Sequence, residues 1–171
     1  MPMKNTRWVN AGTLAFCIAL FPPLWAVAAP YIGVTTGSVA LICAGLYVAA
    51  SNRLDNAPKL SLGFLLGDVW AVLAVHVMAY SPLDGNLTLF LTLFVMGGVA
   101  VLVSSALSRW VDTAAWLCGW AIGLTIQSPQ ALDAAWSLCA QIGVAMLVGV
   151  WYVGAFIAAV QPRLARLFGK E

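Results

Sequence analysis

Charged residues are scarce in this sequence, and their scarcity indicates the solvent in which the chain folds. Of 171 residues, eight are Lys or Arg, six are Asp or Glu, and one is His, so charged residues make up 8% of the chain. Hydrophobic residues make up 63%. A chain of this size has too little interior to hide that much apolar surface from water. The composition therefore excludes an ordinary soluble domain and favours a lipid bilayer.

The sequence also lacks the residue patterns of common catalytic and metal sites. Its four cysteines, Cys17, Cys43, Cys118 and Cys139, lie in apolar stretches without a CxxC pair, and His76 is the single histidine. This excludes a recognisable zinc or redox spacing. No nucleophile with a base and no nucleotide-binding loop is present, and the basic residues form no nucleic-acid surface. We expect no enzyme, no metal or cofactor, and no nucleic-acid partner.

Long apolar runs fill the space between the few charges, and each is a candidate transmembrane helix. A hydrocarbon core about 30 Å thick needs roughly 20 apolar residues per helix. Six runs approach this length, at about 9–29, 32–50, 60–80, 87–107, 111–126 and 134–160. The fifth is short, which leaves open whether it spans or re-enters, and the sixth should tilt. We predict an all-α transmembrane bundle of about six helices, one integral membrane domain over residues 1–171.

The first run carries two further features. Pro22 and Pro23 are adjacent, and proline removes a backbone donor and clashes with the preceding turn, so the first helix should kink or break there. The run also resembles a signal peptide, with a basic head and the sequence Ala26-Val27-Ala28. We expect a retained first transmembrane helix instead.

The basic residues predict the orientation of the bundle. They occur before the first run, between the second and third, between the fourth and fifth, and after the sixth, as Lys4, Arg7, Arg53, Lys59, Arg109, Arg163, Arg166 and Lys170. The other connections carry none. With six spans, every basic residue falls on one side of the membrane, which is the positive-inside pattern. We therefore expect a multi-pass protein of the bacterial inner membrane with both termini in the cytoplasm.

Small residues four positions apart predict where helices pack closely. Three pairs of glycines have this spacing: Gly33 with Gly37, Gly63 with Gly67, and Gly119 with Gly123. Such pairs allow helix backbones to approach closely in lipid. Ordinary close packing is the simpler interpretation, and a pore or pocket lined by exposed backbone is the alternative.

The stretch GDVWAVLAVH, residues 67–76, places Asp68 and His76 inside the third run. At 1.5 Å per residue, Asp68 lies about 12 Å and His76 about 24 Å into the helix. A carboxylate at mid-bilayer is costly unless it is paired, neutral or facing water. No basic residue lies at its depth, so three states stay open: a neutral acid, a carboxylate bonded to helix N-termini or to polar side chains such as Thr35, Ser104 or Gln141, or a carboxylate in a water-filled passage.

Several other side chains are candidates for the path of a solute. Gln141 is a deep amide in the sixth run, and an apolar constriction of deep tryptophans can select solutes by cross-section. The predicted pathway comprises Asp68, Trp70, His76, Gln141, Trp25, Trp116 and Trp120. The simpler alternative for Asp68 is a structural acid that ties helices together, and for His76 a polar tip that reaches the headgroups.

Several stretches together resemble a known family. These are Leu24-Trp25-Ala26-Val27, the Gly-rich second run, and Gly67-Asp68-Val69-Trp70-Ala71-Val72. They are similar to a group of small bacterial inner-membrane proteins that share the domain of unknown function 1097 (DUF1097). The resemblance covers about residues 8–160 and implies no assigned activity.

Three functions follow from these patterns. The leading hypothesis is a passive channel or facilitator for a small polar solute, such as urea, an amide, ammonia or a weak acid, formed by a homo-oligomer in the bilayer. The second is a proton- or ion-coupled secondary transporter with Asp68 as the carrier carboxylate. The third is a membrane scaffold that transports nothing, which predicts a filled interior with no continuous cavity beside Asp68.

Overall fold

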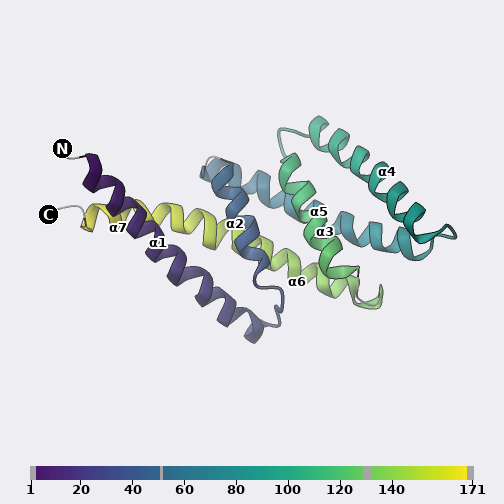
Figure 1. Ribbon diagram of the computed structural model, residues 1–171, viewed down its shortest axis with the longest axis horizontal. Helices are drawn as coiled ribbons and strands as arrows, with labels where there is room; N and C mark the ends of the chain where they lie inside the picture. The colour runs from purple at the N-terminus through teal and green to yellow at the C-terminus, as the bar shows by residue number, and fades with distance from the viewer. Residues whose placement is uncertain (1–2, 51, 129–131, 169–171) are drawn as a thin grey trace.

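The computed structural model describes residues 3–50, 52–128 and 132–168, and this part of the chain is helical without strands. Its α-helices are α1 (Met3–Ala28), α2 (Val39–Ala49), α3 (Ala57–Ala79), α4 (Gly85–Ala106), α5 (Thr113–Gln127), α6 (Ala135–Val148) and α7 (Ile157–Phe168). A π-helical segment, η4 (Gly149–Phe156), joins α6 to α7, so these three elements form one helical run (Figure 1). Each of the six apolar runs contains a helix, which confirms the predicted all-α bundle.

Four helical stretches are long and apolar enough to cross a membrane: Trp8–Ile32, Leu54–Ala79, Gly85–Ala106 and Leu132–Leu167. Helices α2 and α5 are shorter, with 11 and 15 residues, which correspond to roughly 16 Å and 22 Å. A short fifth helix was expected. The second was expected over 32–50 but begins only at Val39, because the chain turns at Gly33, whose φ of 79° is left-handed.

The prolines interrupt the helices less than expected. Helix α1 runs from Met3 to Ala28 with Pro22 and Pro23 inside it, so the helix does not break there, and the alternative of a kink stays a prediction. The sixth run likewise passes its expected end near residue 160 and continues to Phe168 with Pro162 inside α7. A proline removes one backbone donor and crowds the preceding turn, and a membrane helix tolerates this where neighbouring groups or local adjustment of the backbone compensate.

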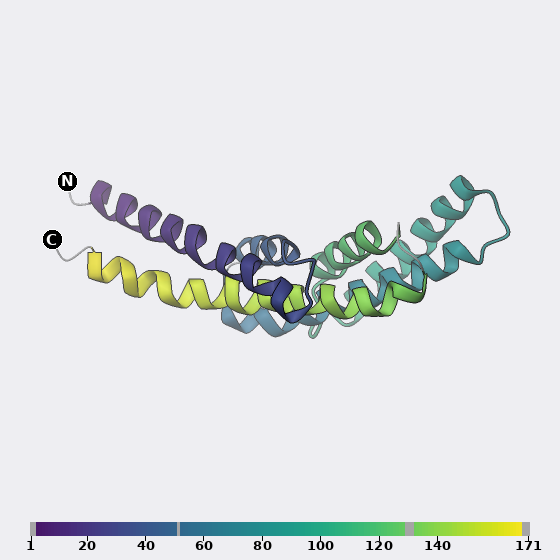
Figure 2. The same ribbon diagram turned by 90° about the horizontal axis from the view of Figure 1, so that it is seen from below.

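The packed helices have consistent relative directions. Contacts advance together along α3 and α5, through the pairs Gly63–Ala115, Gly67–Gly119 and Ala71–Gly123, so these helices are parallel. Helix α2 and η4 are parallel by the same test, through Ala40–Gly149 and Tyr47–Gly154. Helices α1 and α7 are antiparallel, and Figure 2 shows the start of α1 and the end of α7 at the same end of the molecule. These are the directions that six alternating passes require.

The ends of the helices and the connections between them fall into two groups. In Figure 1 the start of α1 and the end of α7 lie at the left, and the end of α2 and the connection from α4 to α5 lie toward the top. The ends of α1, α3 and α5 lie toward the lower right. The basic residues of the described chain occur only in the first of these two groups.

The most extensive contact between helices of the described chain lies between α3 and α5, and it is a close one. A methyl group placed on Gly67 would overlap the carbonyl oxygen of Trp116, and one placed on Gly119 would overlap that of Phe64. Gly63 and Gly123 are similarly confined, so both glycine pairs pack as predicted. The pair Gly33–Gly37 does not: Gly33 has open space and serves the turn, whereas Gly37 lies near Ala29 and Trp25.

Helix α4 contacts helices α3 and α5 through one narrow stripe of buried residues. Its buried residues are Thr88, Thr92, Ala100 and Ser104, spaced by four or eight positions and therefore on one helix face. Many large apolar side chains on its other faces are exposed, among them Phe90, Phe94 and Leu102. A helix with so narrow a buried face and so much apolar surface is suited to contact with lipid.

We expect Gly67→Ala to lower the free energy of unfolding by about 1–3 kcal/mol, the usual cost of overpacking a tight interface. The matched control is Gly98→Ala in α4, where an added methyl group meets nothing within 4 Å. Thermal unfolding of the purified protein in detergent measures both. Equal melting temperatures for the two variants would contradict the close contact between α3 and α5.

Candidate functional site

Asp68 lies at the middle of α3 and is enclosed by neighbouring helices. Its exposed fraction is 1%. Helix α5 approaches it at Gly123 and α6 at Gly143. Both positions lack a side chain, and the carboxyl group occupies the space that they leave. The burial of Asp68 therefore depends on glycines of two other helices.

Gln127, the last residue of α5, is the hydrogen-bond partner of Asp68. Its amide nitrogen Nε2 donates to Asp68 Oδ1 at 2.9 Å, and its exposed fraction is also 1%. A helical side chain tilts toward the N-terminus of its helix. Gln127 therefore extends back over Gly123, where its amide and the carboxyl group of Asp68 meet.

Asp68 thus accepts a hydrogen bond from a polar side chain, which is one of the three states left open by the sequence. The donor is none of the examples Thr35, Ser104 and Gln141, because Gln127 was expected in the connection after the fifth run. Gln127 follows Gly119 and Gly123 at intervals of four, so it continues the glycine face that packs against α3. This spacing is the sequence signal that could have identified it. Of the three expected partners, Ser104 instead donates to Thr113 at 2.9 Å.

Two acceptor atoms of this pair have no hydrogen-bond partner. They are Asp68 Oδ2 and Gln127 Oε1, both fully buried. The thiol of Cys139, on α6, lies beside the carboxyl group, but sulfur–hydrogen groups are weak donors. Buried polar atoms nearly always have a partner, so two unused acceptors in one pair call for a structural or functional explanation.

No cation balances Asp68 within the part of the chain that the structure describes. The ion pair formed there is Arg53 with Asp55 at 3.0 Å on the surface, and Asp68 takes part in none. Exposed pairs of this kind contribute little to stability. Asp68 is thus an acid without counter-charge at the centre of a long apolar helix.

Three of the predicted pathway tryptophans lie between α3, α4 and α5. The rings of Trp70 and Trp116 meet edge to face, with centroids 5.7 Å apart. Trp70 donates to the carbonyl oxygen of Met96 at 3.2 Å, and Trp120 lies under Gly97. The indole nitrogens of Trp116 and Trp120 are buried without partners. These side chains pack α4 against the parallel helices α3 and α5.

The other pathway candidates lie apart from this group. Gln141 accepts hydrogen bonds from the backbone nitrogen and hydroxyl of Thr35, at 3.3 Å and 3.1 Å. Trp25 donates to the carbonyl oxygen of Gly37 at 3.0 Å. Gln141 and Trp25 therefore bind the backbone and side chains of the connection between α1 and α2. His76 Nδ1 lies 2.8 Å from the carbonyl oxygen of Val72, one turn earlier in its own helix.

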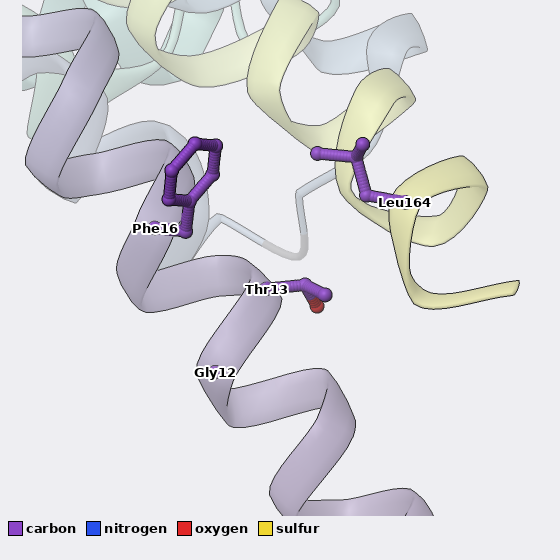
Figure 3. Close-up of a pocket in the computed structure, with 4 residues that line it drawn as sticks. All are labelled: Gly12, Thr13, Phe16 and Leu164. Atoms are coloured by element: carbon purple, nitrogen blue, oxygen red, sulfur yellow. The ribbon is translucent and has the colours of Figure 1, made fainter. Parts of the chain in front are cut away.

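The linings of three cavities on the described surface contain none of the seven pathway candidates. Gly12, Thr13 and Phe16 of α1 and Leu164 of α7 line one of them (Figure 3). A second, mostly apolar, lies among α1, α2, η4 and α7, and a third lies beside α4 and the end of α5. A path through Asp68 stays a prediction.

Its apolar helices make this chain a membrane protein built as a helical bundle. The model of one protein family, the proteins of unknown function DUF1097, matches residues 15–161. The match covers most of the chain, and the protein therefore belongs to the DUF1097 family, as the resemblance predicted. No curated protein and no solved structure matched the chain.

We expect Gln127→Met to lower the free energy of unfolding by about 1–3 kcal/mol, because it leaves both oxygens of a buried carboxyl group without a donor. Gln141→Met is the matched control, since the partner of Gln141 is exposed. Thermal unfolding of both variants beside the wild type measures the difference. A larger loss for Gln141→Met would show that the buried pair contributes little.

Proposed function

We propose that the protein transports a small polar solute across the membrane and that Asp68 is the group that binds the solute or a coupling ion. The observation that supports this most directly is the state of Asp68. The acid is fully buried at the centre of α3, has no counter-charge in the described chain, and retains an unused acceptor beside that of Gln127. An ionisable residue inside a membrane is costly, and such residues commonly mark a transport path.

The enclosed position of Asp68 favours coupled transport over passive flow. A passive channel needs a water-filled passage along its binding groups, whereas a coupled carrier closes over its site in part of its cycle. Asp68 is enclosed in this way, with an exposed fraction of 1% and with α5 and α6 packed against it at Gly123 and Gly143. A passive facilitator for urea, an amide, ammonia or a weak acid is the second candidate, and the experiment below separates the two.

A scaffold with a structural acid is the third candidate, and the filled surroundings of Asp68 favour it. The hydrogen bond from Gln127 ties α5 to α3, as such an acid would. However, a tie that is purely structural leaves the two unused acceptors unexplained. Transport accounts for them as places for a transported or coupling species.

We further propose that the bundle is a homo-oligomer in the bacterial inner membrane with both termini in the cytoplasm. The helix directions agree with six alternating passes, and the basic residues then share one side. Helix α4 exposes a broad apolar surface on which a second copy could pack.

Cysteine labelling tests this orientation. In a background whose four native cysteines are alanine, a membrane-impermeant maleimide added to intact cells should label Leu83→Cys, between α3 and α4, but not Ser108→Cys, between α4 and α5. Both native side chains are exposed, which makes the two positions comparable. Labelling of Ser108→Cys alone would reverse the orientation, and labelling of both would contradict the alternating passes.

Flux into proteoliposomes tests the function itself. Solute uptake by wild type and Asp68→Ala is compared by stopped-flow swelling for urea, acetamide, glycerol, ammonia and acetate, with and without a pH gradient. Coupled transport predicts flux that follows the gradient, and a passive facilitator predicts flux that does not. Either should fall at least about tenfold in Asp68→Ala, the effect of losing roughly 1.4 kcal/mol of interaction. Absence of flux for all solutes, with folded protein, would favour the scaffold.

A further inference from the structure

We propose that Asp68 and Gln127 form a proton-binding site, in which one proton is shared between Asp68 Oδ2 and Gln127 Oε1. This site rests on the transport function proposed above and specifies it further: the species that Asp68 takes up is a proton rather than a metal ion or a solute. The evidence for a proton is the hydrogen bonding of the buried pair.

The pair lacks one donor. The carboxyl and carboxamide groups are planar, and the hydrogen bond from Gln127 Nε2 to Asp68 Oδ1 uses one edge of each. The two atoms left over, Oδ2 and Oε1, are both acceptors when Asp68 is ionised. A proton on Oδ2 would donate to Oε1 and close a second hydrogen bond beside the first. Both atoms without a partner would be satisfied by this one addition.

The groups that surround the pair supply neither a competing charge nor a metal site. The titratable side chains that face Asp68 from other helices are Cys139 on α6 and Cys43 on α2, and α5 presents the neutral amide of Gln127. The neighbours Gly123, Gly143 and Leu65 offer no side-chain ligand. Magnesium and calcium ions require about six or more oxygen ligands, so two side-chain oxygens are better suited to a proton.

Release of the proton would destabilise the contact that encloses it. An ionised Asp68 would leave a buried negative charge next to the carbonyl oxygen of Gln127, with no cation nearby. Water would then have to reach the carboxylate, which requires α5 or α6 to move away from α3. The glycines that confine these helices leave little room for a smaller adjustment. Protonation and closure of the site are thereby linked.

Infrared spectroscopy of the wild-type protein in lipid vesicles tests the site without measuring transport. We expect the carbonyl band of a protonated carboxyl group near neutral pH, absent from Asp68→Asn. The band should move to higher frequency in Gln127→Met, which loses the donor to Oδ1, and should not move in Gln141→Met. A spectrum without an Asp68-dependent band from acidic to neutral pH, or a band indifferent to Gln127→Met, would overturn the proposal.

Thermal unfolding supplies a second readout in case Gln127→Met does not fold. The closed structure holds a proton that the unfolded chain releases above about pH 4, so the melting temperature of the wild type should fall as the pH rises from there toward neutrality. Asp68→Asn mimics the protonated acid, because its amide group can both donate to and accept from Gln127. It should fold and lose most of this pH dependence. An unchanged pH dependence in Asp68→Asn would assign the effect to other groups and overturn the proposal.

The two proposals fail separately. An Asp68-dependent band without flux would preserve the proton site and remove the transport function. Flux without the band would preserve transport and leave the solute itself, not a proton, as the species at Asp68.

Discussion

The close backbone approach of α3 and α5 is the constraint on which the rest of the structure depends. Gly63 and Gly67 on one helix and Gly119 and Gly123 on the other allow two parallel helices to touch along most of the shorter one. Apolar side chains gain little from packing together in a lipid environment, so close contact and hydrogen bonds must supply the attraction between helices. Helix α4 packs on this pair through tryptophans and α6 packs against α3, whereas α1 packs on α7, and α2 packs mainly on η4.

The candidate site is a consequence of that same approach. A side chain at position 123 would take up the space in which the carboxyl group of Asp68 and the amide of Gln127 now meet. The glycine face therefore serves two purposes, since it brings the helices together and creates a small polar compartment between them. Because the compartment is enclosed by backbone, a change in the charge of Asp68 acts directly on helix packing rather than on an open surface.

In this member of the DUF1097 family, the arrangement gives a physical basis for the conspicuous acid of the third run. The carboxyl group, the amide and the two glycines beside them make up the proton-binding site that we propose. Helix α5 ends at Gln127 after 15 residues, and the side chain of Gln127 extends back past Gly123 to reach Asp68.

The sequence alone determined the helical class, the membrane environment, the limits of most apolar runs and the isolation of Asp68, because these follow from composition and from local patterns of charge. It also indicated the glycine pairs, but not that Gly33 belongs to a turn, since a left-handed φ depends on the path of the connection. Only the tertiary structure identified Gln127 as the partner of Asp68 and separated Gln141 and Trp25 from it. Such pairings depend on which helices are parallel and on their register, and residues 59 positions apart carry no local signal of either.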